Sequence, residues 1–211
     1  FPFIQGHELC GDIVEVGQAV TEHKVGDFIS AESHIVNYEG DYFKRGLGHV
    51  APETEIIGIH CDGAFAEYIK LPWQNARKNP KDMPTKIAVL KENFGNAVHT
   101  AYAVDLQDKN VLITGCGPVG LMTILVARAI GAKTIIASEI SPYRSDFAKR
   151  LGADYVANPK LDLTERVLEL THGIGVDVQL EVVSFDQLTA VLLDQRFDLV
   201  VIGWENLGAD P

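Results

Sequence analysis

A glycine-rich segment, Gly-Cys-Gly-Pro-Val-Gly at residues 115–120, has the spacing of a backbone turn that binds phosphate. In this pattern the first glycine allows a tight turn, the second lets the backbone approach a pyrophosphate, and the third lets a helix pack closely on a strand. The pattern alone is weak, because glycine-rich turns without a ligand are common. Here it follows an apolar run at residues 111–114 and precedes apolar residues at helical spacing over residues 118–130. This context predicts a dinucleotide site in which the free N–H groups of the helix start bind the phosphates. The cofactor-binding candidates in it are Gly115, Gly117, Pro118, Val119 and Gly120, while Cys116 is expected to be a small buried thiol.

An acidic residue, Glu139, follows the strand expected at residues 134–138. It stands about 20 residues beyond the glycine turn, where a carboxylate binds the ribose hydroxyls and repels a 2′-phosphate. The position therefore favours NAD over NADP. Arg144 is a further candidate, and it could offset this preference by lying along the adenosine.

A histidine and a glutamate, His7 and Glu8, precede the strand expected at residues 13–17. Imidazole and carboxylate groups are both zinc ligands. Adjacent residues of a regular strand point to opposite faces, so the pair can bind one ion only if Gly6 turns the chain. From these residues alone, the pair is either a metal site or a surface feature.

The spacing around this pair resembles the zinc signature of the medium-chain dehydrogenase superfamily. Residues 6–20 read G-H-E-x-x-G-x5-G-x2-V, and every position matches. The resemblance implies that His7 binds a catalytic zinc and that Glu8 lies beside the metal and can reach it. It also implies a cysteine ligand upstream of Phe1, for which neither Cys10 nor Cys61 is a substitute.

Three further segments are similar to the threonine dehydrogenases of this superfamily: residues 34–36, 78–84 and 90–100. The similarity runs from residue 1 to about residue 183. It implies that Glu92 approaches the zinc as a fourth ligand or a proton relay, and that His34 faces the substrate. Asn93 replaces the usual proline of this segment. Without the resemblance, Glu92 would be an acid at a helix start and His34 a loop histidine.

One departure from the family concerns a second, structural zinc, which four cysteines bind in a lobe after residues 34–36. The corresponding positions are Asn37, Gly40, Phe43 and Ala51. A lobe without thiolates cannot bind zinc in that way. We therefore expect one catalytic zinc and no structural zinc, with Phe43 and Tyr42 replacing the metal by apolar packing.

The pattern of expected secondary structure changes near residue 95. The first part is β-rich, with strands expected at residues 13–17, 27–30 and 65–69, a polar excursion at 37–52 and a loop at 80–84. The second part alternates strands at residues 111–114, 134–138, 155–157, 176–183 and 199–202 with helices at 118–130, 142–151, 163–171 and 186–194. Such alternation implies a parallel sheet with helices on both faces. Gly203, which follows the last strand, is a further cofactor-binding candidate.

The resemblance gives these two parts an α/β architecture. It implies a GroES-like β-rich catalytic domain at residues 1–95 and a Rossmann domain, a doubly wound parallel sheet, at residues 96–211. The chain starts at Phe1 without a methionine and ends after an expected strand, so we expect a fragment with both domains partial. That fragment is expected to be inactive as it stands.

The composition is that of a globular chain of 211 residues, with 46% apolar and 22% charged residues. A net charge of -11 argues against a nucleic-acid or anionic-membrane binder. The three cysteines form no CxxC pair, which indicates free thiols in a reducing compartment. No signal peptide opens the chain. We therefore expect a cytoplasmic location. A charge-free run at residues 111–127 approaches membrane-spanning length, but its glycines and proline favour a strand, a turn and a helix.

These features predict a zinc-dependent oxidoreductase that transfers a hydride from a secondary alcohol, by resemblance the 3-hydroxyl of L-threonine, to NAD. Zinc would lower the pKa of the hydroxyl and Glu92 would shuttle the proton. The substrate is a small molecule, and a homo-oligomer is expected. Two alternatives stay open: a polyol or secondary-alcohol dehydrogenase of the same superfamily, and a non-catalytic remnant that binds NAD.

Overall fold

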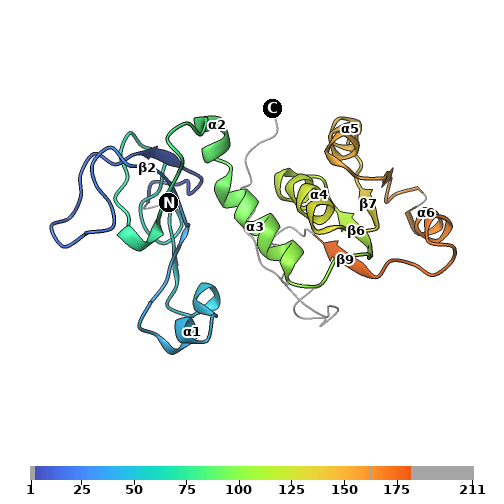
Figure 1. Ribbon diagram of the computed structural model, residues 1–211, viewed down its shortest axis with the longest axis horizontal. Helices are drawn as coiled ribbons and strands as arrows, with labels where there is room; N and C mark the ends of the chain where they lie inside the picture. Colours follow the sequence, from blue (N-terminus) through green and yellow to red (C-terminus); the bar gives the residue numbers. More distant parts are fainter. Residues whose placement is uncertain (1–2, 162, 182–211) are drawn as a thin grey trace. The chain divides into compact units, whose positions relative to one another are not determined.

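The computed structural model of the protein describes residues 3–161 and 163–181 (Figure 1). The chain divides into two compact units, residues 1–92 and residues 93–211. The division falls inside helix α3, Lys91–Tyr102. The domain boundary that the sequence places at residue 95 lies in the same helix and stays a prediction.

The first unit is built from short antiparallel strands. Three of them form a sheet in the order β1-β2-β5, with β1 at Cys10–Asp12, β2 at Phe28–Ala31 and β5 at Ala76–Lys78. Strand β3 at His34–Ile35 pairs with β4 at Glu55–Ile56. Short helices are α1 at Asp41–Lys44 and α2 at Thr85–Ala88, with single 3-10 turns at Gly48–Val50 and Trp73–Asn75. The strand expected at residues 27–30 is confirmed, shifted by one residue, and residues 80–84 form a loop.

Two other expected strands of this unit, at residues 13–17 and 65–69, are wrong. Ile13 exchanges two backbone hydrogen bonds with the turn at Gly26 and Asp27, and the chain then leaves the sheet. In the second segment Phe65 is 75% exposed. Apolar alternation produces a strand only where a neighbouring backbone pairs with it over several residues. Among the described residues, the backbone bonds of these two segments to other segments are confined to Ile13 and to Phe65, whose N–H donates to Gln5. The polar excursion at 37–52 contains α1 and the 3-10 turn at Gly48–Val50.

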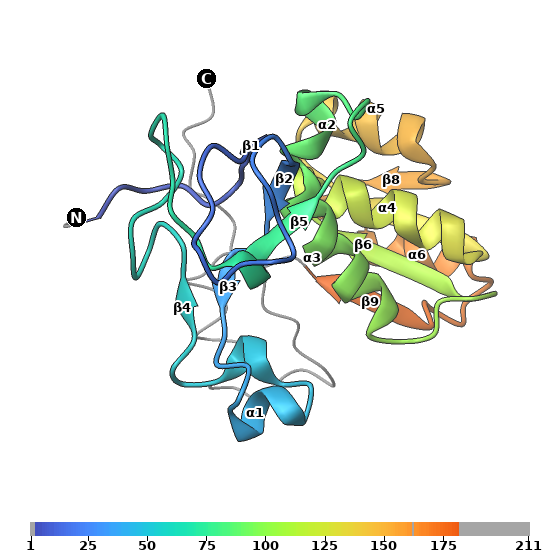
Figure 2. The ribbon, with the colours of Figure 1, turned by 60° about the vertical axis from the view of Figure 1, so that its left-hand side comes forward.

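The second unit is a parallel sheet in the order β8-β7-β6-β9. Figure 2 labels three of these strands, β6, β8 and β9. Its strands are β6 at Asn110–Thr114, β7 at Thr134–Ser138, β8 at Tyr155–Ala157 and β9 at Val178–Glu181. Its remaining helices are α4 at Pro118–Ile130, α5 at Pro142–Leu151 and α6 at Leu163–Leu170. The predicted bounds of β7, β8, α4 and α5 are confirmed. The helix expected at residues 186–194 and the strand at 199–202 lie outside the described residues, as does Gly203.

Alternate residues of the central strands pack against helices on opposite faces of this sheet. Val111 and Ile135 belong to one core cluster together with Ile124 of α4 and Ala148 of α5. The intervening residues Leu112 and Ile136 pack in a second cluster with Val167 of α6. Because successive strand residues point to opposite faces, α4 and α5 cover one side and α6 covers the other. The predicted doubly wound α/β arrangement is confirmed.

The helix ends of this unit are set by local chemistry. Ser141 caps the start of α5 and accepts a hydrogen bond from the N–H of Arg144, and Pro118 occupies the first turn of α4. Gly131 and Gly152 follow α4 and α5 with φ angles of 99° and 114°, a left-handed conformation that glycine adopts without strain. The charge-free run at residues 111–127 thus becomes a strand, a turn and most of a helix. Within the described ranges, no helix has both the length and the apolar character needed to span a bilayer.

Candidate metal centre and dinucleotide site

Three side chains of the first unit come together as a candidate metal centre. His7, Glu8 and Glu92 each offer one ligand atom, and these atoms lie within 4.8 Å of one another. Gly6 has a φ of 94°, so the chain turns directly before the pair, as binding of one ion by both residues requires. In the part of the chain that the structure describes, this is the one group of three or more histidine, cysteine or acidic residues with that geometry.

The turn at Gly6 is held by the loop at residues 58–65. The N–H groups of Gly63 and Ala64 donate to the carbonyl oxygens of Ile4 and Gly6, at 2.7 and 2.8 Å. The packing is so close that a Cβ atom on Gly63 would lie 2.1 Å from the carbonyl oxygen of Gly6. A side chain at position 63 would therefore displace the segment that carries His7 and Glu8.

Burial keeps the His7 side chain neutral. The residue is 3% exposed, and burial lowers the pKa of its imidazole. The charge of Glu8 partly opposes this shift, and the neighbouring His34 adds to it. A neutral imidazole has the lone pair that a metal needs. One imidazole nitrogen and two carboxylate oxygens are ligands that fit zinc.

Glu92 lies in the first turn of α3, which a polar network fastens to the sheet of the first unit. Lys91 Nζ donates to Asn79 Oδ1 at 2.9 Å, and Asn79 Nδ2 donates to Ser30 Oγ at 2.9 Å. Ser33 Oγ also donates to Glu92 Oε1 at 3.5 Å. No motif in the sequence singles out Ser33, because its importance arises from the approach of two segments far apart in the chain.

His34 lies beside this centre. Its Nδ1 is 3.2 Å from Ser33 Oγ and 3.1 Å from Glu32 Oε1. The hydrogen bond from His34 is the main cause that lowers the pKa of Glu32. His34 is also near enough to His7 to influence its pKa, so the structure brings the predicted substrate-facing histidine next to the predicted ligands.

The predicted dinucleotide turn lies in the second unit, between β6 and α4. Gly115 has a φ of 84°, and its N–H donates to the carbonyl oxygen of Ser138 at 2.9 Å. Gly117 caps α4 in an extended conformation, and Pro118 and Val119 form the first turn of the helix. A Cβ atom on Gly120 would lie 2.0 Å from the carbonyl oxygen of Gly115, which explains the third glycine as a close approach of helix and turn.

The acidic residue of this site, Glu139, is 7% exposed and directly follows β7. Its Oε2 accepts a hydrogen bond from the N–H of Cys116 at 2.9 Å, and its Oε1 accepts from the N–H groups of Ile140 and Ser141 at 2.8 Å each. The sequence did not predict these backbone contacts. Cys116 is buried as expected, and burial, with a smaller effect of Glu139, raises the pKa of its thiol to about 12. Arg144 acts in the opposite direction, so its charge also lies near the turn.

The lobe at the four missing cysteine positions is packed by an aromatic pair. The rings of Tyr38 and Phe43 meet edge to face with centroids 4.8 Å apart. A Cβ atom on Gly48 would lie 3.1 Å from the Phe43 ring, so the 3-10 turn packs closely on it. Phe43 therefore contacts another ring of the lobe, but its partner is Tyr38 rather than Tyr42, and Phe43 and Tyr42 are 40% and 39% exposed.

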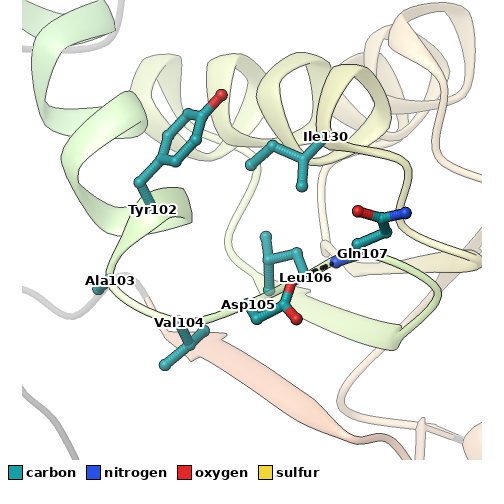
Figure 3. Close-up of a pocket in the computed structure, with 7 residues that line it drawn as sticks. All are labelled: Tyr102, Ala103, Val104, Asp105, Leu106, Gln107 and Ile130. Carbon is teal, nitrogen blue, oxygen red and sulfur yellow. Dashed lines mark hydrogen bonds between the residues drawn. The ribbon is translucent and has the colours of Figure 1, made fainter.

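A surface pocket of about 450 Å³ lies elsewhere in the second unit (Figure 3). It is lined by Tyr102, Ala103, Val104, Asp105, Leu106, Gln107 and Ile130. Ile130 is the last residue of α4, so the pocket lies at the end of this helix remote from the glycine turn. None of the predicted site residues lines it.

Comparisons with known proteins match both units. Residues 1–81 match the model of the alcohol dehydrogenase GroES-like domain, and residues 118–208 match that of the zinc-binding dehydrogenase family. The L-threonine 3-dehydrogenase of Pyrococcus furiosus is 50% identical over 181 residues, which cover 85% of this chain and 52% of the relative. The chain thus spans about half the length of the curated relatives it matches.

Solved structures agree with this assignment. The alcohol dehydrogenase TADH from Thermus sp. ATN1 superposes with a TM-score of 0.82 at 28% identity, covering 92% of this chain and 58% of that one. A protein from Sinorhizobium meliloti 1021, described as a zinc-binding dehydrogenase and bound to NADP, gives a TM-score of 0.80 at 28% identity, over 89% and 56% of the two chains. With its zinc signature, its dinucleotide turn and both family domains, the chain belongs to the zinc-containing medium-chain dehydrogenase superfamily.

Proposed function

We propose that this chain is part of a zinc-dependent dehydrogenase that transfers a hydride from the 3-hydroxyl of L-threonine to NAD. The observation that carries the proposal is the group formed by His7, Glu8 and Glu92, which lies in one unit of a chain whose other unit holds a complete glycine turn with Glu139. The resemblance to L-threonine 3-dehydrogenases supports the choice of substrate.

His7, Glu8 and Glu92 would hold the metal. A bound zinc would supply a Lewis acid that lowers the pKa of an alcohol hydroxyl. Around it, burial keeps His7 in the neutral form that binds metal, and the hydroxyl of Ser33 orients the carboxylate of Glu92. A carboxylate placed in this way can take up a proton from an alcohol, which is the role we assign to Glu92.

His34 is the residue to which we assign contact with the substrate. Its Nδ1 is held by Ser33 and Glu32, which fixes the orientation of the ring. The opposite ring nitrogen, Nε2, is then the atom that can form a hydrogen bond with a substrate group. The adjacent Glu32 carries a carboxylate that would attract the ammonium group of an amino acid.

The second unit would bind the cofactor. The N–H groups at the start of α4 would take the pyrophosphate, and Glu139 would lie beside the adenosine ribose. Hydride transfer is the chemistry of the nicotinamide itself, so the protein contributes orientation and charge. We assign NAD rather than NADP on the carboxylate of Glu139, and one zinc per chain on the absence of cysteine at positions 37, 40, 43 and 51.

The test is a substrate panel with the natural full-length protein. NADH formation would be followed with L-threonine, with a polyol such as sorbitol and with a simple secondary alcohol. We expect the highest kcat/KM with L-threonine. A preference for the polyol would assign the protein to the polyol dehydrogenases, and NAD binding without turnover of any alcohol would support a non-catalytic role. A homo-oligomer, expected from the family, and a cytoplasmic location, expected from the cysteine pattern, stay proposals that sedimentation and cell fractionation would test.

A further inference from the structure

Glu139 joins two loops that the sequence treats as separate features. The glycine turn follows β6, and the turn that starts α5 follows β7, with Thr114 and Ser138 paired at the adjacent strand ends. The Glu139 carboxylate lies between these turns and is almost fully buried. A buried carboxylate is stable only when its oxygens accept hydrogen bonds.

Within the described part of the chain, the carboxylate accepts three bonds, and all of them come from backbone N–H groups. Oε2 accepts from Cys116 in the glycine turn, whereas Oε1 accepts from Ile140 and Ser141 before α5. An ionised carboxylate offers about four acceptor positions, so this arrangement fills most of them. The lengths of 2.8 to 2.9 Å are those of strong, charge-assisted hydrogen bonds.

We propose that Glu139 is a positioning residue whose carboxylate joins the glycine turn to the β7–α5 turn by hydrogen bonds, a link that we call the clasp. The clasp fixes the phosphate-binding backbone before the cofactor binds. The inference rests on the proposed dinucleotide site and goes beyond the exclusion of a 2′-phosphate. Excluding a phosphate requires a negative charge near the ribose, but it requires no bonds to the backbone. The glycine turn, with Gly115 at a φ of 84°, has wide conformational freedom, which the bond at Cys116 restricts.

The clasp also limits how Glu139 binds the ribose. Among the described residues, Oε1 accepts two bonds, from Ile140 and Ser141, whereas Oε2 accepts one, from Cys116. With the clasp intact, Oε2 is therefore the oxygen better placed to accept a ribose hydroxyl.

Two variants of the natural full-length protein separate the clasp from the exclusion of phosphate. Glu139→Asp keeps the charge but is one methylene too short to reach both turns, whereas Glu139→Gln keeps the length but has a single acceptor oxygen. We expect both variants to weaken the binding of NAD and of NADP by about tenfold or more, since each loses hydrogen bonds to a charged group. Dissociation constants would be measured by titration, with circular dichroism as the control for folding.

Hydrogen exchange gives a readout that is independent of cofactor. In Glu139→Gln the single acceptor oxygen can serve only one of the two turns, so either the amide of Cys116 or the amides of Ile140 and Ser141 should lose protection. The amide of Gly115, which donates to Ser138, should keep its protection. Unchanged protection at all three of these partner amides would overturn the clasp. A second pair of results would also overturn the clasp: wild-type nucleotide affinity in Glu139→Asp, and a changed ratio of the NAD and NADP dissociation constants as the only effect of Glu139→Gln. Glu139 would then serve only to exclude a 2′-phosphate. A wild-type protein that binds neither nucleotide would instead overturn the proposed function.

Discussion

The hydroxyl of Ser33 donates a hydrogen bond of 3.5 Å to Oε1 of Glu92, joining the segment between β2 and β3 to the first turn of α3. Groups that hydrogen-bond to a metal ligand fix its orientation, and their loss commonly weakens metal binding. We expect Ser33→Ala to lower the zinc affinity of the protein about tenfold. Competition with a chromogenic chelator would measure the change.

The matched control for this prediction is Ser33→Thr, which keeps a hydroxyl at the same position. Ser33 is 2% exposed, so the added methyl group must find room, and unfolding in urea would show whether it does. A folded Thr variant with wild-type zinc affinity would attribute the loss in the Ala variant to the hydroxyl. Equal affinity in the wild type and in Ser33→Ala would show that Glu92 does not depend on this bond.

A metal count tests the two zinc assignments together. We expect about one equivalent of zinc per chain, because a single ligand group is present among the described residues and the positions 37, 40, 43 and 51 lack thiolates. His7→Ala should release most of this zinc, since it removes the one imidazole of the group. His172→Asn, which changes an exposed histidine of the other unit, should leave the count unchanged. Two tightly bound ions in the wild type would show that another zinc site exists.

Cofactor choice should follow from charge. A 2′-phosphate beside the ribose would face the carboxylate of Glu139, and like charges in contact disfavour binding by several kcal/mol. We expect NAD to bind the wild-type protein about tenfold or more tightly than NADP. The structurally similar protein from Sinorhizobium meliloti is bound to NADP, so the fold alone does not determine which of the two cofactors is bound. Equal dissociation constants would indicate that Arg144 compensates for the acidic residue.

The elements of the second unit could be predicted from the sequence because each one carries its own signals. Ser141 and Pro142 mark the start of α5, Gly152 marks its end, and the apolar strands β6 and β7 are buried on both faces. Local propensity and tertiary packing agree there, so pattern and structure coincide. The zinc signature and the glycine turn were found for the same reason, since their spacing is local.

The contacts that a sequence pattern does not contain were missed. Ser33 reaches Glu92 across 59 positions of the chain, and the bonds of Glu139 to backbone N–H groups leave no trace in residue types elsewhere. The failed strand at residues 13–17 has the same cause. Its apolar and polar residues alternate as in a strand, but a strand also needs another backbone segment beside it. The order of residues alone does not specify which segment lies there.

Two glycine substitutions should distinguish a glycine that close packing requires from a glycine that only makes the backbone more flexible. In Gly120→Ala the new Cβ atom would lie 2.0 Å from the carbonyl oxygen of Gly115, so turn and helix must separate. We expect a loss of about 2 kcal/mol or more in the free energy of unfolding, together with weaker NAD binding. In Gly95→Ala, inside α3, the Cβ atom meets no atom of the described residues within 4 Å apart from those of its own helix backbone and chain neighbours. That variant should gain about 0.5–1 kcal/mol, because alanine favours a helix interior over glycine. Urea unfolding would measure both, and equal stability of the two variants would contradict the packing argument.

Thiol reactivity should rank the three cysteines by burial. The pKa of Cys116 is raised to about 12, chiefly by burial, so at pH 8 only about one thiol in ten thousand would be ionised. Since the thiolate is the reactive form, iodoacetamide should modify Cys116 far more slowly than the partly exposed Cys10 and Cys61, whose pKa values burial also raises. Peptide mass spectrometry over time would give the three rates. In urea the burial is lost, the pKa of Cys116 returns toward its ordinary value and the rates should converge. Modification of native Cys116 as fast as Cys61 would mean that the glycine turn opens to solvent, which would also weaken the case for a clasp at Glu139.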